Sequence, residues 1–314
     1  MERKINYSII IPHKNIPNLL RRCLDSIPRR DDVQIIVVDD NSDPDIVNFE
    51  QFPGLNDPFV EVFFTKEGKG AGFARNIGLT KAVGKWLLFA DADYFYNYCI
   101  NDILNDYLDS DYDIIYFLNN SVDSDFYTTT YRCIGSNNLI KQWLNSSKKN
   151  DALLRYRRLV IWSKIFKKEF VNKYSIVFDE VSISDDTTFG YLTGHYASSV
   201  YADARALYCS TIRQDSLQHS KRSFEKKITE FYVICKYYKF YREHNIPFTY
   251  NFSIGNFLIK SFLQGREYYY KAKNIMLELG FTSGEIIKLC LYAILIYNPK
   301  KVLLKLFSRP QKIP

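Results

Sequence analysis

The fold class of this chain is decided at residues 86–93, which read WLLFADAD. Five consecutive apolar residues are typical of a strand that is buried on both faces of a sheet, and two aspartates follow where this strand ends. Residues 7–12 (YSIIIP) repeat the apolar run, and residues 33–40 (VQIIVVDD) repeat both the run and the paired aspartates. The repetition predicts neighbouring strands of one buried sheet.

Segments with helical spacing separate these strands. Apolar residues recur one turn apart over residues 19–27, and residues 70–83 predict a second helix that Gly84 would close. Residues 59–64 and 113–118 are further strand candidates. The alternation of strands and helices predicts an α/β fold in which helices flank a mostly parallel sheet.

The loops after the predicted strands carry the polar groups. Ligands bind beyond the carboxyl ends of parallel strands, so residues 12–15, 39–40 and 91–93 are expected to meet at one edge. The glycine fingerprint of dinucleotide folds is absent after the first strand, and so is a P-loop. Asp91 and Asp93 could instead hold Mg²⁺ or Mn²⁺, which would grip a diphosphate. The alternative reading of these two residues is a solvated acidic turn.

Motifs in the first hundred residues resemble family 2 glycosyltransferases of the GT-A fold. In sequence order they are SIIIP at 8–12, RCLDSI at 22–27, IIVVDDNS at 35–42, ARNIGL at 74–79 and ADAD at 90–93. The resemblance is close over residues 6–95 and looser to about residue 220. It implies an inverting transferase that uses a nucleotide-diphosphate sugar, with a UDP-sugar expected and a GDP- or dTDP-sugar as alternatives.

The resemblance also implies a nucleotide site. The residues it places there are Pro12, Asn15, Asp39, Asp40, Arg75 and Asp91, with Asp93 as the direct ligand of Mn²⁺ or Mg²⁺. Asp39 and Asp40 could instead belong to a helix-capping loop, and Arg75 to a salt bridge at a helix start. The chain departs from the family where Lys14 replaces a frequent tyrosine and Tyr94 a frequent third acidic residue. Tyr94 could therefore shape the donor or acceptor pocket.

An inverting transfer needs a carboxylate base for the acceptor hydroxyl. The segment WSKIFKKEF at 162–170 resembles the stretch that precedes this base in the family, which implies Asp186 as the base and Asp185 as the alternative. The competing interpretation is a helix start in which Ser184 is the N-cap and the aspartates face the helix dipole. His219 is a candidate third metal ligand, although a lone loop histidine is more often only polar.

Residues 1–215 are expected to form the catalytic domain and residues 216–314 a basic helical region. The second segment carries 17 Lys and Arg against 6 Asp and Glu. Residues 289–297 are apolar, and residues 299–307 alternate basic and aliphatic positions at helical spacing. This pattern favours an anionic membrane surface, a homodimer contact or docking on the core. The aspartates at the sheet edge argue against nucleic acid as a partner.

The remaining features concern location and the rival functions. Six scattered cysteines and a strand close to Met1 suggest a cytoplasmic protein without a signal peptide, or one peripheral on the inner face of the membrane. Family relatives that build capsule or lipopolysaccharide imply a glycan or lipid-linked acceptor. The rival enzyme class is a sugar nucleotidyltransferase, whose glycine- and arginine-rich loop is missing after the first strand. The non-enzyme rival is a basic nucleic-acid-binding protein.

Overall fold

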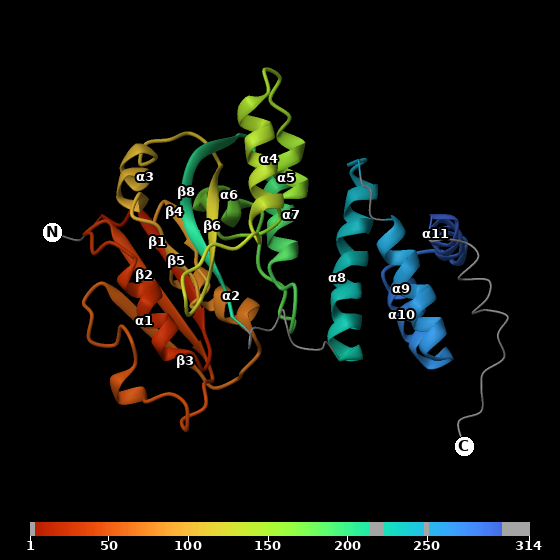
Figure 1. The fold of residues 1–314 in the computed structure, drawn as a ribbon, viewed down its shortest axis with the longest axis horizontal. Coiled ribbons are helices and arrows are strands. Elements are labelled where there is room, and N and C mark those ends of the chain that lie inside the picture. The colour runs from red at the N-terminus through yellow and green to blue at the C-terminus, as the bar shows by residue number, and fades with distance from the viewer. Residues whose placement is uncertain (1–3, 214–222, 248–250, 297–314) are drawn as a thin grey trace. The chain divides into compact units, whose positions relative to one another are not determined.

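The structure is a computed structural model that describes residues 4–213, 223–247 and 251–296 (Figure 1). The chain divides into two compact units, Met1–Ser220 and Lys221–Pro314. The first unit holds a sheet, and the second is helical throughout its described residues.

Strands of the first unit form one sheet in the order β3-β2-β1-β4-β7-β6-β8-β5 within the described residues. Their bounds are β1 (Tyr7–His13), β2 (Val33–Asp40), β3 (Val60–Thr65), β4 (Trp86–Phe89), β5 (Phe95–Tyr96), β6 (Ile114–Asp123), β7 (Lys164–Lys167) and β8 (Val200–Ile212). The run from β3 to β4 is parallel, as predicted. The sheet as a whole is mixed, because β7 is antiparallel to β4 and β6, and β5 is antiparallel to β8.

Helices cover both faces of the sheet, which explains the continuous apolar runs. Along β1, Ile9 and Ile11 point into one core and Ile10 into the other. The first core includes α1 (Pro17–Asp25) and α3 (Ile100–Asp106). The second includes α2 (Ala71–Lys81), α4 (Ile134–Asn145), α5 (Asp151–Arg157), α6 (Lys168–Lys173) and α7 (Thr187–Tyr196). A short 3₁₀ turn, η1 (Phe49–Gln51), lies between β2 and β3.

Gly84 does not close the second helix. The helix α2 ends at Lys81 with Ala82 in the cap position. Gly84 instead lies against β1, where a Cβ atom would come within 2.7 Å of the Ser8 nitrogen. The missing side chain of Gly84 is therefore needed for close packing of two backbones rather than for a helix cap.

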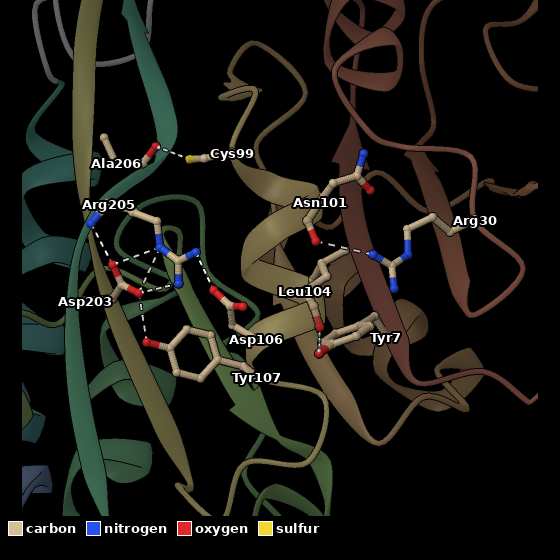
Figure 2. A network of polar contacts seen from close by, with 10 residues as sticks. All are labelled: Tyr7, Arg30, Cys99, Asn101, Leu104, Asp106, Tyr107, Asp203, Arg205 and Ala206. Carbon is tan, nitrogen blue, oxygen red and sulfur yellow. Dashed lines mark hydrogen bonds and ion pairs between the residues drawn. The ribbon is translucent and has the colours of Figure 1, made fainter.

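A bulge in β8 is held by a network of polar side chains (Figure 2). Arg205 Nη2 lies 2.6 Å from Asp203 Oδ2, and its Nη1 lies 2.6 Å from Asp106 Oδ2 at the end of α3. The Tyr107 hydroxyl donates to Asp203 over 2.8 Å. A bulge changes the direction of the strand residues that follow it. This network ties the bulge to the end of α3 and so fixes the direction in which β8 continues toward the carboxyl end of β4.

The second unit consists of α8 (Phe224–Glu243), α9 (Asn251–Gln264), α10 (Arg266–Glu278) and α11 (Ser283–Ile296). Its core includes Phe231, Cys235, Ile254, Leu258 and Met276. The prediction of a helical C-terminal region is confirmed. Within the described residues no helix combines the length and apolar character needed to cross a membrane. The basic stretch after residue 296 lies outside the described residues.

Candidate active site

Asp91 and Asp93 occupy a turn that is fastened from two neighbouring elements. The backbone N–H of Asp91 donates to the Tyr208 hydroxyl over 2.7 Å. The carbonyl of Asp93 accepts from Arg22 Nη2 at 2.6 Å and from Thr211 Oγ1 at 2.8 Å. Thus β8 and α1 hold the backbone, and both carboxylate groups remain partly exposed.

The negative charge of the Asp93 carboxylate is only weakly compensated by nearby cations. Burial and the neighbouring Asp91 raise the pKa of Asp93 to about 6, against a smaller lowering effect of Arg213. Arg213 Nε lies 3.6 Å from Asp93 Oδ2, which is too long for a hydrogen bond. A carboxylate with so little compensation is suited to receive a cation. Tyr94 is buried against Trp162 and Tyr208, so its ring packs in the core and does not line an open pocket.

Arg75 joins the two acidic parts of the site. Its side chain is buried in the first turns of α2, where Nη2 lies 2.6 Å from Asp91 Oδ1 and Nη1 donates to Asp185 Oδ2. Burial would lower the pKa of Arg75, but Asp185 and Asp91 raise it. One charged guanidinium therefore bridges residues that lie 94 positions apart in the sequence.

Gly72 allows α2 to approach the segment that carries Asp185. A Cβ atom at Gly72 would lie 2.0 Å from the Asp179 carbonyl oxygen and 3.0 Å from Asp185 Cβ. Any larger residue would separate the two backbones and draw Arg75 away from Asp185. The glycine before the arginine is therefore a geometric requirement of the bridge.

Asp186 lies next to Asp185 at the start of α7. It occupies the N-cap position of α7 but makes no side-chain cap bond. Ser184 is therefore not the N-cap; it lies two residues earlier, in a left-handed conformation with φ of 59°. Burial and the adjacent Asp185 raise the pKa of Asp186 to about 6. Burial also raises the pKa of Asp185, and Arg75 opposes that shift.

Asp39 and Asp40 have different surroundings. Asp39 accepts from His13 Nδ1 at 2.7 Å and from the Ser42 backbone N–H at 2.9 Å. Burial alone would raise the pKa of Asp39, but these bonds lower it. Asp39 thus fixes the positions of His13 and Ser42. Asp40 Oδ2 accepts from the Gly70 N–H at 2.9 Å, while its buried Oδ1 has no hydrogen-bond partner among the described residues.

Pro12 and Asn15 help to shape the loop between β1 and α1. Pro12 is buried in β1 opposite Val38 of β2. Asn15 has a φ of 57°, and its side-chain oxygen accepts from the Asp43 N–H at 2.7 Å. Lys14 Nζ donates to the Asp40 carbonyl at 3.0 Å. The loops after β1 and β2 are therefore fastened together beside Asp40.

Several site residues were not anticipated from the sequence. His13 holds Asp39, and Arg22 holds Asp93, although neither lies in a pattern that indicates these long-range contacts. Lys164 and Arg158 are both buried, and Lys164 Nζ donates to the Arg158 carbonyl at 2.7 Å. Burial lowers the pKa of Arg158 to about 10.

His219, the predicted third metal ligand, lies outside the described residues.

The metal prediction rests on Asp91 and Asp93. Residues 4–213, 223–247 and 251–296 contain no group of three or more His, Cys, Asp or Glu side chains placed to hold a metal ion. The site thus offers two carboxylates at the sheet edge, with Arg75 and Asp185 beside them.

Sequence comparison assigns this acidic edge to a family. The sequence profile described as Glycosyl transferase family 2 matches residues 8–165, half of the chain. The chain belongs to glycosyl transferase family 2. The matched range contains β1 through the start of β7 and includes Asp40, Arg75, Asp91 and Asp93.

Relatives of this family 2 chain include glycosyltransferases of two bacteria. The putative glycosyltransferase EpsH of Bacillus subtilis is 23% identical over 236 residues, which are 69% of this chain and 64% of EpsH. The glycosyltransferase GlyA of Streptococcus pneumoniae is 24% identical over 67% of this chain and 31% of its own length. The family 2 chain therefore spans less than two thirds of both relatives.

Solved structures confirm the GT-A fold of this family 2 chain. TarS of Staphylococcus aureus, residues 1–349 in complex with UDP-GlcNAc, matches with a TM-score of 0.57 and 20% identity, covering 74% of this chain and 66% of that one. The mannosyltransferase PcManGT of Pyrobaculum calidifontis, in complex with GDP-Man and Mn²⁺, matches with a TM-score of 0.51 and 13% identity over 96% and 84%.

Proposed function

We propose that this chain transfers a sugar from a nucleoside-diphosphate donor to an acceptor hydroxyl, with inversion at the anomeric carbon. The observation that carries the proposal is the Arg75 bridge. It brings Asp91, which belongs to the donor side, next to Asp185 and Asp186, which belong to the acceptor side. A site of this kind has a place for a leaving diphosphate and a base within one cluster.

The nucleotide is held through Asp40 and Arg75. Asp40 Oδ1 is a buried acceptor that no donor reaches in the part of the chain that the structure describes, which costs stability unless a ligand donor satisfies it. The imide or amide N–H of a nucleotide base is such a donor. TarS and PcManGT were solved with UDP-GlcNAc and with GDP-Man. We propose a UDP-sugar as the donor here, with GDP- and dTDP-sugars as the alternatives to test.

Mn²⁺ or Mg²⁺ fits the carboxylates of Asp91 and Asp93. Protein sites for Mg²⁺ often use one or two carboxylates and leave the remaining positions to phosphate oxygens and water. A bound ion would neutralise the charge that develops on the departing diphosphate. The long separation of 3.6 Å between Asp93 Oδ2 and Arg213 Nε, which leaves the carboxylate available to an ion, supports this assignment.

Asp186 acts as the base. Its carboxylate takes the proton of the acceptor hydroxyl while the acceptor oxygen forms a bond to the anomeric carbon. The bond from that carbon to the diphosphate oxygen breaks, and the nucleoside diphosphate leaves with the bonding electrons. Asp185 stays paired with Arg75, which keeps its charge compensated and leaves Asp186 free for the acceptor.

The acceptor is a glycan or a lipid-linked saccharide of a bacterial surface polymer. The names of the relatives support this class, since one is a poly(ribitol-phosphate) beta-glucosyltransferase, 34% identical over 91 residues. A cytoplasmic location at the inner membrane face would suit such an acceptor. The roles of residues 216–314 at an anionic surface or in a homodimer remain predictions.

Activity should depend on pH through Asp186. A base works only in its ionised form, and the pKa of Asp186 is raised to about 6. We expect kcat/KM to be constant above this pH and to fall about tenfold per pH unit below it. The measurement is nucleoside diphosphate release from pH 4.5 to 8.5, with unfolding followed in parallel. A profile that stays flat to pH 5 would contradict the assignment.

The proposed activity is tested with a panel of nucleotide sugars. Wild-type protein, Asp93→Ala and the control Asp109→Ala are incubated with UDP-, GDP- and dTDP-sugars and Mn²⁺, and nucleoside diphosphate release is measured. Asp109 is an exposed carboxylate in the turn after α3. We expect one donor class to react, a loss of about 10²-fold or more in Asp93→Ala, and an unchanged control. If no donor gives nucleoside diphosphate release and Asp93→Ala is equal to wild type, the proposal is contradicted.

A further inference from the structure

Exposed aromatic side chains gather on a short hairpin between β6 and α4. We call residues 121–131 the aromatic hairpin. Phe126 is 79% exposed, Tyr127 is 56% exposed and Tyr131 is 82% exposed. Large exposed aromatic groups that lie close together in sequence on one loop commonly mark a binding surface.

The aromatic hairpin is a defined structure. Its strands are joined by the bonds from the Asp123 N–H to the Thr128 carbonyl and from the Thr130 N–H to the Ser121 carbonyl, both 2.8 Å long. At the tip, Asp123 Oδ1 accepts from the Phe126 N–H at 2.9 Å. The aromatic residues therefore have a fixed backbone beneath them.

Tyr127 holds an unfavourable backbone conformation. Its φ is 54°, in the left-handed region that a bulky residue rarely adopts. Glycine or asparagine would fit this turn at lower cost, yet a tyrosine occupies it. Strain of this kind tends to be kept at ligand sites. The Tyr127 ring is therefore a candidate contact for a ligand.

Arg22 connects the aromatic hairpin to the candidate active site. Its Nη1 donates to the Ser124 carbonyl at 3.1 Å, and its Nη2 donates to the Asp93 carbonyl at 2.6 Å. The same guanidinium lies 5.8 Å from the centre of the Tyr127 ring and 5.4 Å from that of Phe95. The Arg22 side chain thus contacts both the aromatic hairpin and the turn that carries Asp93.

A second arginine fixes the other end of the aromatic hairpin. Arg132 Nη1 donates to the Thr211 carbonyl at 2.9 Å, and its guanidinium lies 5.2 Å from the centre of the Tyr94 ring. Thr211 in turn donates its hydroxyl to the Asp93 carbonyl. Both arginines are therefore engaged with protein groups near Asp93.

The chemistry of the exposed tip favours an uncharged saccharide. Residues 124–131 read SDFYTTTY, which combines three aromatic rings, several hydroxyls and one carboxylate without any Lys or Arg. A pyranose has an apolar face of C–H groups that stacks on aromatic rings and a rim of hydroxyls that suits threonine. An anionic lipid headgroup would instead require basic side chains.

We propose that the aromatic hairpin binds the acceptor saccharide and orients its reacting hydroxyl toward the Asp93 turn. The inference rests on the proposed function, since it names the surface that receives the acceptor of that reaction. Tyr127 and Tyr131 stack against sugar rings of the acceptor. The hairpin thereby selects acceptors by their ring faces, while Asp40, Arg75 and Asp91 select the donor.

The test measures saccharide binding separately from turnover. The full chain is mixed with methyl α- and β-glycosides and with maltotriose, and saturation-transfer NMR records contact with each sugar. The variants are Tyr127→Asn, which removes the ring but tolerates a positive φ, Tyr127→Phe, which keeps it, and Tyr131→Ala. Tyr98→Ala serves as control, because Tyr98 is 97% exposed outside the hairpin.

We expect saturation transfer to at least one sugar in wild type, Tyr127→Phe and Tyr98→Ala, and an about fivefold loss in Tyr127→Asn and Tyr131→Ala. Calorimetric titration with UDP should give the same dissociation constant for all of them. In turnover assays, the KM for the saccharide should rise in the two weakened variants, while the KM for the nucleotide sugar stays constant.

The outcomes separate this inference from the proposed function. No transfer to any sugar in wild type, or equal transfer in all variants, overturns the inference. A loss of binding to phosphatidylglycerol vesicles in the hairpin variants, without a change in sugar contact, also overturns it and makes the hairpin a membrane contact. Failure of the proposed function appears elsewhere, as the absence of nucleoside diphosphate release and of UDP binding in wild type.

Discussion

Replacing Arg75 with alanine should reduce kcat/KM by about 10³-fold or more. The guanidinium is the buried partner of both Asp91 and Asp185. Removing one partner of a buried ion pair costs about 3–5 kcal/mol, because the remaining charge is left without compensation. In Arg75→Ala two carboxylates lose their shared cation, so the pKa of Asp185 should rise further and the donor diphosphate should lose a positive contact.

Arg75→Lys distinguishes charge from geometry. Lysine keeps the positive charge but has no planar fork to reach two carboxylates at once. We expect it to recover only a part of the lost activity. Arg21→Ala on the exposed face of α1 is the matched control and should remain within about twofold of wild type. Full activity of folded Arg75→Lys would contradict a requirement for the bridge.

Replacing Asp186 with asparagine should have the second large effect, a fall in kcat of about 10²- to 10⁴-fold. Asparagine has nearly the same shape but cannot accept the acceptor proton. Because Asp186 makes no cap bond and no ion pair within the described residues, its loss should leave the fold and the UDP dissociation constant unchanged. Turnover with acceptor and calorimetric titration with UDP check the two halves of this prediction.

The comparison with Asp185→Asn assigns the base. Asp185 is paired with Arg75, so this variant should weaken the bridge and impair both donor affinity and turnover. Glu180→Gln, an exposed carboxylate of the same segment, is the control. If Asp185→Asn abolished turnover with unchanged UDP binding, while Asp186→Asn remained active, the two roles would have to be exchanged.

The sequence predicted those parts of the fold that depend on local pattern. The apolar runs at β1, β2 and β4 have nearly the bounds that their composition indicates, and the carboxyl ends of β2 and β4 do carry the paired aspartates. The short strands β5 and β7 were not identified. Each is stabilised by pairing with distant partners, and neither carries a distinctive pattern of its own.

The site could be predicted residue by residue but not contact by contact. Asp91, Arg75 and Asp185 were singled out individually, whereas the bridge between them depends on how closely α2 packs at Gly72. Ser184 was a reasonable N-cap by residue type, yet the backbone places Asp186 in that position. The aromatic hairpin was missed because residues 95–160 have little periodicity, and the exposure of a side chain is a tertiary property.

The most direct test of the account is the anomeric configuration of the transferred sugar. An α-linked donor such as UDP-GlcNAc is incubated with wild-type protein, Mn²⁺ and a saccharide to which the NMR experiment shows contact, and the product is followed by proton NMR. If Asp186 activates the acceptor opposite a diphosphate held at Asp91 and Asp93, the new linkage should be β and should be missing with Asp186→Asn. An α-linked product, or consumption of the donor that does not depend on Asp186, would contradict the account.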